Sequence, residues 1–338
     1  MRIAIVNDMP MVRELLRRLI AGIPDCEVAW SAGDGQEAVE KCAEDTPDLL
    51  IMDIVMPRLD GVGATRQIMK KSPCPILIVT ATVDGNSANV FEALGEGAVD
   101  AVNTPLAEDM SNDEGRFQEV VRKIRIMQRL APPHTTLAGS HHVPPRTATA
   151  PMVAIGASTG GPKAIDSLLA VIPRDFHAMF TVVQHIDQQF ANGMAGWLGA
   201  NCALPVRTVV ADDIPQTGMV LLAATNDHMI MTTDGRLDYV LQPENNPFRP
   251  SVDVYFNSLA ANWPTPGIAV LLTGIGNDGA AGLLRLRQAG WSTFAQDRDS
   301  CVVYGMPKAA AKLGAAQEVL PPAEIGKRII SLIVNWNG

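Results

Sequence analysis

Short runs of apolar residues alternate with helical patterns along the first 130 residues of the chain. Segments such as MVRELLRRLIAGI carry apolar residues at helical spacing between strand-like runs of a few residues. Five strand–helix units in succession predict a doubly wound parallel five-stranded sheet. The expected strands lie in RIAIVND, CEVAWSAG, LLIMDIV, PILIVTA and AVDAVN. The last helix is expected over 113–130, with Phe117, Val120, Val121, Ile124 and Leu130 facing the core.

The pattern changes after residue 130. Residues 131–150, APPHTTLAGSHHVPPRTATA, are rich in Pro, Thr and His and have no apolar period, so we interpret them as a linker. A metal-binding histidine cluster there is the less favoured alternative. Strand and helix patterns resume over 151–338, which predicts a second, doubly wound α/β domain. Its strands are expected in MVAIGAS, AMFTVVQHI, MVLLAAT and GIAVLLTGIG, and its helices in PKAIDSLLAVI, AGLLRLRQAG and PAEIGKRIISLIVNW.

Composition narrows the class of protein. With 338 residues, 47% hydrophobic and 19% charged, the chain is long enough for two globular domains. A net charge of -9 makes a large nucleic-acid surface unexpected. The five cysteines form no CxxC pair, which favours neither a zinc site nor a disulfide framework. The first residues do not resemble a signal peptide, and no apolar run reaches the roughly 20 residues of a membrane span, so we expect a cytoplasmic protein without membrane insertion.

Polar residues end three strands of the first predicted sheet. Asp8 follows the first strand, Asp53 the third and Thr80 the fourth. Ligands of parallel α/β sheets bind at the carboxyl ends of the strands, so these side chains are expected to converge there. Two carboxylates suit a hard cation such as Mg²⁺, which prefers oxygen ligands. An Asp that merely ends a strand is the alternative, and it explains one such residue better than a pair.

The segments LLIMDIVMPRLDGV, IVND and IVTA together resemble a response-regulator receiver domain, which has a flavodoxin-like fold. The resemblance implies that Asp53 accepts a phosphoryl group from a histidine kinase. It also implies that Asp8 and the Val55 carbonyl hold Mg²⁺ beside Asp53, and that Thr80 binds a phosphoryl oxygen.

The receiver pattern has three departures. Asn7 stands where receivers usually carry the first of two acids, and Ala101 stands at the usual aromatic switch position. Thr104, in VNTP, stands where a Lys usually pairs with the phosphoryl charge. We therefore expect phosphorylation at Asp53 and treat Thr80 and Thr104 as the switch residues.

The segment GASTGGPK, residues 156–163, follows an apolar strand and precedes a helix. A phosphate-binding loop would need Lys where Pro162 stands, so this interpretation is disfavoured. The same residues contain G-x-S-x-G, in which glycines permit the sharp turn that lifts a nucleophilic Ser158 above the sheet. Alone, the motif is weak, since small-residue turns often serve only packing.

A base and an acid end neighbouring strands. His185 closes AMFTVVQHI, and Asp278 lies in TGIGNDGAAG after another apolar run. Ser158, His185 and Asp278 therefore form a candidate nucleophile, general base and orienting carboxylate. His177 begins its strand at the opposite edge, while His228 lies in a loop or hairpin and is a candidate for facing the substrate.

Five blocks of the second domain resemble the catalytic domain of CheB-type protein-glutamate methylesterases. They are VAIGASTGGP, VVQHI, PSVDVYFNSLA, LLTGIGNDGAAGL and CVVYGMPKAA, and they cover most of residues 151–320. The family's catalytic serine, histidine and aspartate fall on Ser158, His185 and Asp278. Thr159 follows the nucleophile, and Ile275 stands beside the site where relatives often have Met, so both are candidates for contacts with the oxyanion or the substrate.

The two resemblances imply a phosphorylation-regulated methylesterase of a chemosensory adaptation pathway. It would release methanol from glutamate γ-methyl esters on the cytoplasmic domain of a methyl-accepting chemoreceptor and would also deamidate glutamines. A CheA-type histidine kinase would phosphorylate the receiver, which would cover the catalytic cleft until then. Ester hydrolysis would need no cofactor, and we expect a monomer. The receiver ending AVNTPL resembles the WspF branch of surface-sensing systems.

Two other functions compete with the esterase. The first is a phosphorylation-responsive docking protein without turnover, which the three candidate catalytic residues argue against. The second is a DNA-binding response regulator, which the net charge of -9 and the absence of a basic helix-turn-helix pattern argue against.

The segment RPSVD leaves two interpretations open. Arg249 and Asp253 would line a substrate groove in one, whereas Ser251 would cap a helix in the other.

Overall fold

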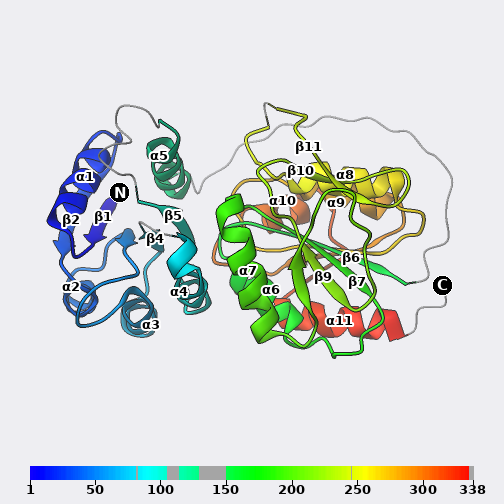
Figure 1. The fold of residues 1–338 in the computed structure, drawn as a ribbon, viewed down its shortest axis with the longest axis horizontal. Helices are drawn as coiled ribbons and strands as arrows, with labels where there is room; N and C mark the ends of the chain where they lie inside the picture. Colours follow the sequence, from blue (N-terminus) through cyan, green and yellow to red (C-terminus); the bar gives the residue numbers. More distant parts are fainter. Residues whose placement is uncertain (81–82, 105–113, 129–149, 245, 335–338) are drawn as a thin grey trace. The chain divides into compact units, whose positions relative to one another are not determined.

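The computed structural model describes residues 1–80, 83–104, 114–128, 150–244 and 246–334, which fall into two compact units, Met1–Pro132 and Pro133–Gly338 (Figure 1). The expected linker 131–150 lies outside the described residues except for its last residue.

The first unit is a five-stranded sheet with the order β2-β1-β3-β4-β5, and all of its strand pairs are parallel. This is the doubly wound sheet predicted from the strand–helix alternation. The strands are β1 (Arg2–Val6), β2 (Glu27–Ala32), β3 (Leu49–Met52), β4 (Ile76–Thr80) and β5 (Asp100–Asn103). The helices are α1 (Pro10–Ala21), α2 (Gly35–Glu44), α3 (Gly61–Lys71), α4 (Val83–Gly95) and α5 (Glu114–Gln128).

Helices α1 and α5 cover one face of this sheet. Leu16 and Ile20 of α1 pack in one buried cluster with Val120 and Ile124 of α5 and with apolar residues of β1, β3 and β4. The predicted core side of the last helix is therefore confirmed at Val120 and Ile124, and Val121 packs against the same cluster while staying half-buried. The Phe117 side chain and all of Leu130 lie outside what the structure describes.

The second unit is a seven-stranded parallel sheet with the order β14-β13-β12-β6-β7-β9-β8, together with an antiparallel hairpin, β10–β11. Its strands are β6 (Met152–Ala157), β7 (Met179–Gln184), β8 (Val206–Thr208), β9 (Met219–Leu222), β10 (His228–Met231), β11 (Leu237–Val240), β12 (Ile268–Leu271), β13 (Ser292–Gln296) and β14 (Glu318–Leu320). Its helices are α6 (Gly161–Leu169), α7 (Gln188–Asn201), α8 (Val252–Asn262), α9 (Ala280–Gln288), α10 (Met306–Lys312) and α11 (Pro322–Val334).

The strand order changes direction at β6, which lies between β7 and β12. In register, Ala157 of β6 pairs with Gln184 of β7, and Gly156 of β6 pairs with Leu271 of β12. The carboxyl ends of these three strands therefore meet at one edge of the sheet. Such a switch point opens the crevice in which α/β proteins bind ligands.

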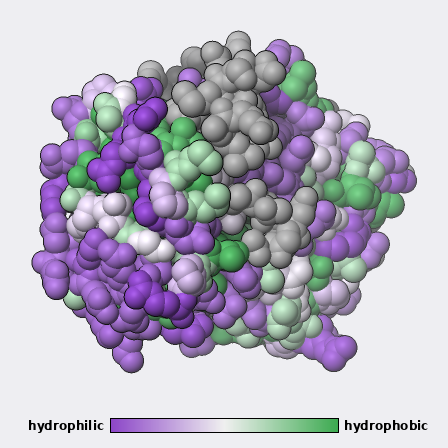
Figure 2. All heavy atoms as spheres, turned by 60° about the vertical axis from the view of Figure 1, so that its left-hand side comes forward, coloured by the Kyte–Doolittle hydropathy of each residue, from purple (hydrophilic) through white to green (hydrophobic). Residues whose placement is uncertain are grey.

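Hydrophobic side chains stay largely inside both units. No helix in the described ranges has the length and apolar character that crossing a membrane requires. The face of the molecule shown in Figure 2 is mostly hydrophilic, with hydrophobic residues in small separate areas. Scattered exposed apolar residues of this kind are normal for a globular surface.

Candidate active site

Ser158 is the first residue after β6, in the sharp turn that leads into α6. Its N–H donates to the Thr273 carbonyl at 3.0 Å, and its own carbonyl accepts the Gly161 N–H at 2.7 Å. Gly160 has a φ of +77°, and a Cβ there would lie 2.5 Å from Val302 Cβ. Both facts require glycine at this position, as the G-x-S-x-G motif predicts.

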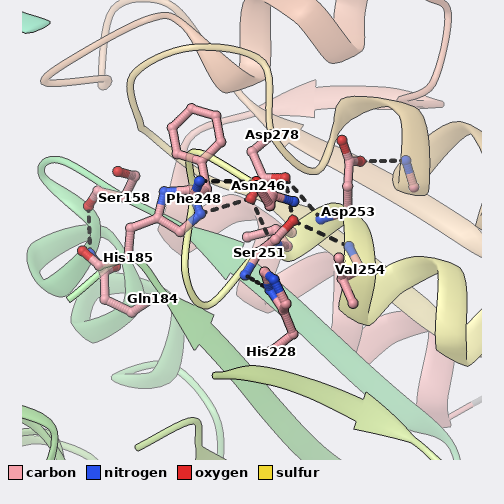
Figure 3. A network of polar contacts seen from close by, with 12 residues as sticks. Ser158, Gln184, His185, His228, Asn246, Phe248, Ser251, Asp253, Val254 and Asp278 are labelled. Atoms are coloured by element: carbon pink, nitrogen blue, oxygen red, sulfur yellow. Dashed lines mark hydrogen bonds and ion pairs between the residues drawn. The ribbon is translucent and has the colours of Figure 1, made fainter. Parts of the chain in front are cut away.

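His185 and Asp278 form a close pair beside this turn. His185 Nε2 lies 2.8 Å from Asp278 Oδ2. The other ring nitrogen, Nδ1, is buried and has no hydrogen-bond partner in the described part of the chain. Ser158 and Asp278 lie on opposite sides of the imidazole ring (Figure 3). The ring therefore has Nδ1 free to accept a proton, while Nε2 is held by the carboxylate.

Asp278 is buried at the amino end of α8. Besides His185, its carboxylate accepts the Ser251 hydroxyl at 2.7 Å and the N–H groups of Val252 at 2.6 Å and Asp253 at 3.1 Å. Burial acts to raise the pKa of Asp278, but the hydrogen bonds from His185, Ser251 and Val252 and the imidazole's charge lower it below its ordinary value. The group is thus an ionised carboxylate with a fixed orientation.

The RPSVD segment supports the helix-capping interpretation. Ser251 is the N-cap of α8, and its Oγ accepts the Val254 N–H at 3.3 Å. Arg249 pairs with Asp227 at 2.8 Å, and Asp253 Oδ1 accepts the Gly282 N–H at the start of α9 at 2.6 Å. These three residues therefore organise the loops behind Asp278.

The expectation that His228 faces the substrate is wrong. His228 begins β10 and is fully buried. Its Nδ1 accepts the Ser251 N–H at 3.1 Å, and its Nε2 lies 3.2 Å from the Pro243 carbonyl. This arrangement fits a neutral ring with hydrogen on Nε2, because a carbonyl can only accept. His177 is exposed just before β7, at the opposite end of that strand from His185, as expected.

Two residues of this site were not found from the sequence. Phe248 stacks on the His185 ring with centroids 5.0 Å apart, and nothing in the sequence links it to the histidine. Gln184 donates its side-chain amide to the Ser158 carbonyl at 2.8 Å and to the His185 carbonyl at 3.2 Å. The sequence offered one indication of this role, because Gln184 directly precedes His185 at the end of a predicted strand.

The two candidate oxyanion or substrate residues lie on loops next to Ser158. Thr159 is buried, and its carbonyl accepts the Thr273 hydroxyl at 3.0 Å. Ile275 is half-buried and follows Gly274, where a Cβ would lie 2.7 Å from Ser158 Cβ. The loop after β12 therefore passes directly beside Ser158, and Ile275 belongs to it.

In the first unit, Asp53 follows β3 and is half-buried. Asn7, at the end of β1, donates its side-chain amide to Asp53 Oδ2 at 2.7 Å. Burial raises the pKa of Asp53 to about 6, and the charge of Asp8 adds to this rise. Hydrogen bonds from the N–H groups of Ile54 and Val55 and from the Asn7 amide act in the opposite direction and lower the pKa.

The candidate switch residues end neighbouring strands of the same sheet. Thr80 is the last residue of β4, and Thr104 follows β5; both are buried. The Thr104 N–H donates to the Thr80 carbonyl at 2.9 Å. The Thr104 hydroxyl has no hydrogen-bond partner in the ranges the structure describes, so it remains available at this sheet edge.

The residues around Asp53 fit Mg²⁺ better than a transition metal. Asp8 is exposed, and its negative charge acts on Asp53. The described residues include no group of three or more His, Cys, Asp or Glu side chains that could hold a metal. Two carboxylates and a main-chain carbonyl such as that of Val55 are hard oxygen donors, the kind of ligand that Mg²⁺ prefers.

In metal-free protein we expect Asp53 to titrate near pH 6, and carboxyl NMR of labelled aspartates measures this. An unfolded Asp has a pKa of about 3.9, so the folded chain binds more protons between about pH 4 and pH 6. The contribution of Asp53 to the free energy of unfolding therefore falls as the pH rises through this window. Asp8→Asn removes a neighbouring negative charge and should lower the midpoint, as should added Mg²⁺. A midpoint at or below pH 4 in the metal-free protein would contradict the burial argument.

Comparisons with known proteins give one consistent result. The CheB methylesterase family model matches residues 153–329, and the response regulator receiver domain model matches residues 3–111. The chain is 51% identical over 336 residues to "Protein-glutamate methylesterase/protein-glutamine glutaminase 4" of Burkholderia thailandensis, covering 98% of both chains. It is 49% identical over 336 residues to "Protein-glutamate methylesterase/protein-glutamine glutaminase 2" of Cupriavidus metallidurans, again covering 98% of both.

A solved structure is similar to the second unit. The catalytic domain of Thermotoga maritima CheB methylesterase is 32% identical and has a TM-score of 0.53, covering 55% of this chain and 100% of that one.

Proposed function

The chain belongs to the CheB methylesterase family, with a receiver domain before the catalytic domain, and from this premise we propose its substrate and its working residues. It is a phosphorylation-regulated protein-glutamate methylesterase. We propose that it hydrolyses glutamate γ-methyl esters on the cytoplasmic domain of a chemoreceptor to glutamate and methanol. The domains would be 1–130 and 151–338, joined by the linker 131–150.

The chemistry would be carried by Ser158, His185 and Asp278. Ser158 Oγ attacks the ester carbonyl while His185 Nδ1 takes its proton. The protonated imidazole then gives that proton to the leaving methanol. A water, activated by the same nitrogen, releases the free glutamate from Ser158. The hydrogen bond of 2.8 Å between His185 Nε2 and Asp278 is the observation that carries this assignment, since it leaves Nδ1 as the base.

The oxyanion formed in each step would be stabilised by main-chain donors. Thr159 follows the nucleophile at the amino end of α6, where N–H groups and the helix dipole favour negative charge. Ile275, on the loop beside Ser158, would contact the substrate chain. A glutamine side chain offers the same carbonyl with ammonia as leaving group, which supports deamidation as a second activity at the same residues.

Regulation would begin at Asp53. A CheA-type histidine kinase would transfer a phosphoryl group to this carboxylate, with Asp8 and the Val55 carbonyl holding Mg²⁺. Mg²⁺ neutralises phosphoryl charge when it is bound. Thr80 and Thr104 offer hydroxyls at the same sheet edge, so they would respond to the phosphoryl group through hydrogen bonds in place of a lysine's charge. The protein would act in the cytoplasm as a monomer, in a two-component chemosensory adaptation pathway.

The assay that tests this function measures methanol released from receptor membranes carrying methylated glutamates. We expect release by the full chain to rise severalfold when Mg²⁺ and a small phosphodonor such as acetyl phosphate are added. Asp53→Asn should keep the basal rate and lose the rise, because an amide cannot accept the phosphoryl group. Asp48→Asn changes another aspartate of the same unit and should behave like wild type.

Each failure has a distinct meaning. No release from receptors that a related esterase demethylates would overturn the enzyme and favour the docking protein. Release that ignores the phosphodonor would keep the enzyme and remove Asp53 as its switch.

A further inference from the structure

Gln184 is the last residue of β7, and its side chain is almost fully buried at the carboxyl edge of the sheet. One amide nitrogen, Nε2, donates to two main-chain carbonyls, at 2.8 Å to Ser158 and at 3.2 Å to His185. These carbonyls belong to the proposed nucleophile and base. Figure 3 shows Gln184 below Ser158, joined to it by the first of these bonds.

The hydrogen-bonding capacity of its partners determines which end of the Gln184 amide faces them. Both partners are carbonyl oxygens, which accept and cannot donate, so the nitrogen must face them. The other end of the amide, Oε1, is buried without a hydrogen-bond partner among the described residues. A Cβ at Gly161 would lie 1.9 Å from that oxygen, so a side chain at 161 would displace the amide from this position. Burying Oε1 without a hydrogen-bond partner costs free energy. The favourable contribution of this side chain therefore comes from the two hydrogen bonds that its Nε2 donates.

The hydrogen bond from Gln184 to the Ser158 carbonyl also fixes the orientation of the neighbouring N–H group. The Ser158 carbonyl and the Thr159 N–H belong to the same planar trans peptide, so they point in opposite directions. Holding the carbonyl therefore sets where the Thr159 N–H points. The next peptide is held too, because the Thr159 carbonyl accepts the Thr273 hydroxyl at 3.0 Å.

We propose that Gln184 is a positioning residue that locks the Ser158–Thr159 peptide in the orientation that presents the Thr159 N–H to the oxyanion. The inference rests on the proposed function, since it needs Ser158 as nucleophile. Without the amide, the carbonyl retains only the Gly161 N–H at 2.7 Å, and the peptide can rotate away from its working orientation. The oxyanion exists only in the transition state, so the loss should appear in kcat and leave KM nearly unchanged.

Gln184→Met keeps the length of the side chain and removes both donors. We expect kcat for methanol release from methylated receptor membranes to fall by about tenfold to a hundredfold, with KM within about twofold of wild type. The ratio of mutant to wild-type kcat should not depend on pH.

The pH dependence of kcat in Gln184→Glu distinguishes a positioning role from a purely structural one. When protonated, the introduced carboxyl can donate one hydrogen bond to a carbonyl; when ionised, it donates none and repels both. The ratio of its kcat to that of wild type should therefore fall as the pH rises. Circular dichroism at each pH confirms that the chain stays folded.

Asn262→Asp is the matched control. Asn262 also donates its side-chain amide to a main-chain carbonyl, that of Met231 at 2.7 Å, at the far end of α8. It should lose the same kind of bond without changing kcat. A folded Gln184→Met with kcat within twofold of wild type would overturn the proposal, and if that variant does not fold, a flat pH ratio for Gln184→Glu does so. Wild type that releases no methanol would instead overturn the proposed function.

Discussion

Ser158→Ala is expected to lower methanol release by roughly a thousandfold or more, because it removes the proposed nucleophile and leaves the rest of the site in place. The substitution deletes one oxygen from a side chain already packed beside Gly274 and the loop after β12. Its main-chain bonds to Thr273 and Gly161 do not involve that oxygen. The free energy of unfolding should therefore change by no more than about 0.5 kcal/mol.

Methanol release and urea unfolding of the same preparation test this prediction together. Ser167→Ala is the matched control, since Ser167 lies on the next helix and donates its hydroxyl to the Lys163 carbonyl at 2.9 Å. It should keep wild-type activity. A Ser158→Ala protein that retains a tenth of the wild-type rate would mean that another group attacks the ester, and it would remove Ser158 from the mechanism.

The doubly wound fold of both units could be predicted because the strands at the centre of each sheet are buried on both faces. A strand of a covered parallel sheet, such as β3 or β6, is a continuous apolar run that stands out from the amphipathic helices around it. The G-x-S-x-G turn was recognisable for a local reason, since the positive φ at Gly160 favours glycine.

What the sequence did not reveal depends on contacts between distant segments. Phe248 stacks on His185 from 63 positions further along the chain, and no residue pattern encodes that distance. His228 was expected to face the substrate because it lies in a loop or hairpin. The α8 cap and the Pro243 carbonyl instead supply a partner for each ring nitrogen, which makes full burial possible. RPSVD was ambiguous for the same reason, because only the fold shows that Ser251 meets both Val254 and Asp278.

Asp278→Asn is expected to lower methanol release by about a thousandfold to ten-thousandfold. The carboxylate accepts from His185 Nε2, so it holds hydrogen on that nitrogen and leaves the Nδ1 lone pair for the serine proton. An amide at this place can turn its NH₂ toward Nε2, which then becomes the acceptor and moves the ring hydrogen to Nδ1. That tautomer cannot take a proton from Ser158.

The same substitution should also destabilise the catalytic unit. Asp278 accepts three further bonds, from the Ser251 hydroxyl and the N–H groups of Val252 and Asp253, and a neutral amide with one oxygen cannot satisfy all of them. We expect a loss of about 2–4 kcal/mol in the free energy of unfolding, because buried donors lose a charged acceptor. Urea unfolding measures this loss separately from activity.

Asp253→Asn separates the two effects. Burial and the charge of Asp278 raise the pKa of Asp253 to about 7, so near neutral pH its carboxyl is partly protonated and resembles an amide. Its Oδ1 contact with the Gly282 N–H at 2.6 Å can be kept by an asparagine oxygen. This variant should retain activity within about threefold. If Asp278→Asn were folded under the assay conditions and as active as Asp253→Asn, the carboxylate would be only a helix cap, and the tautomer argument for His185 would fail.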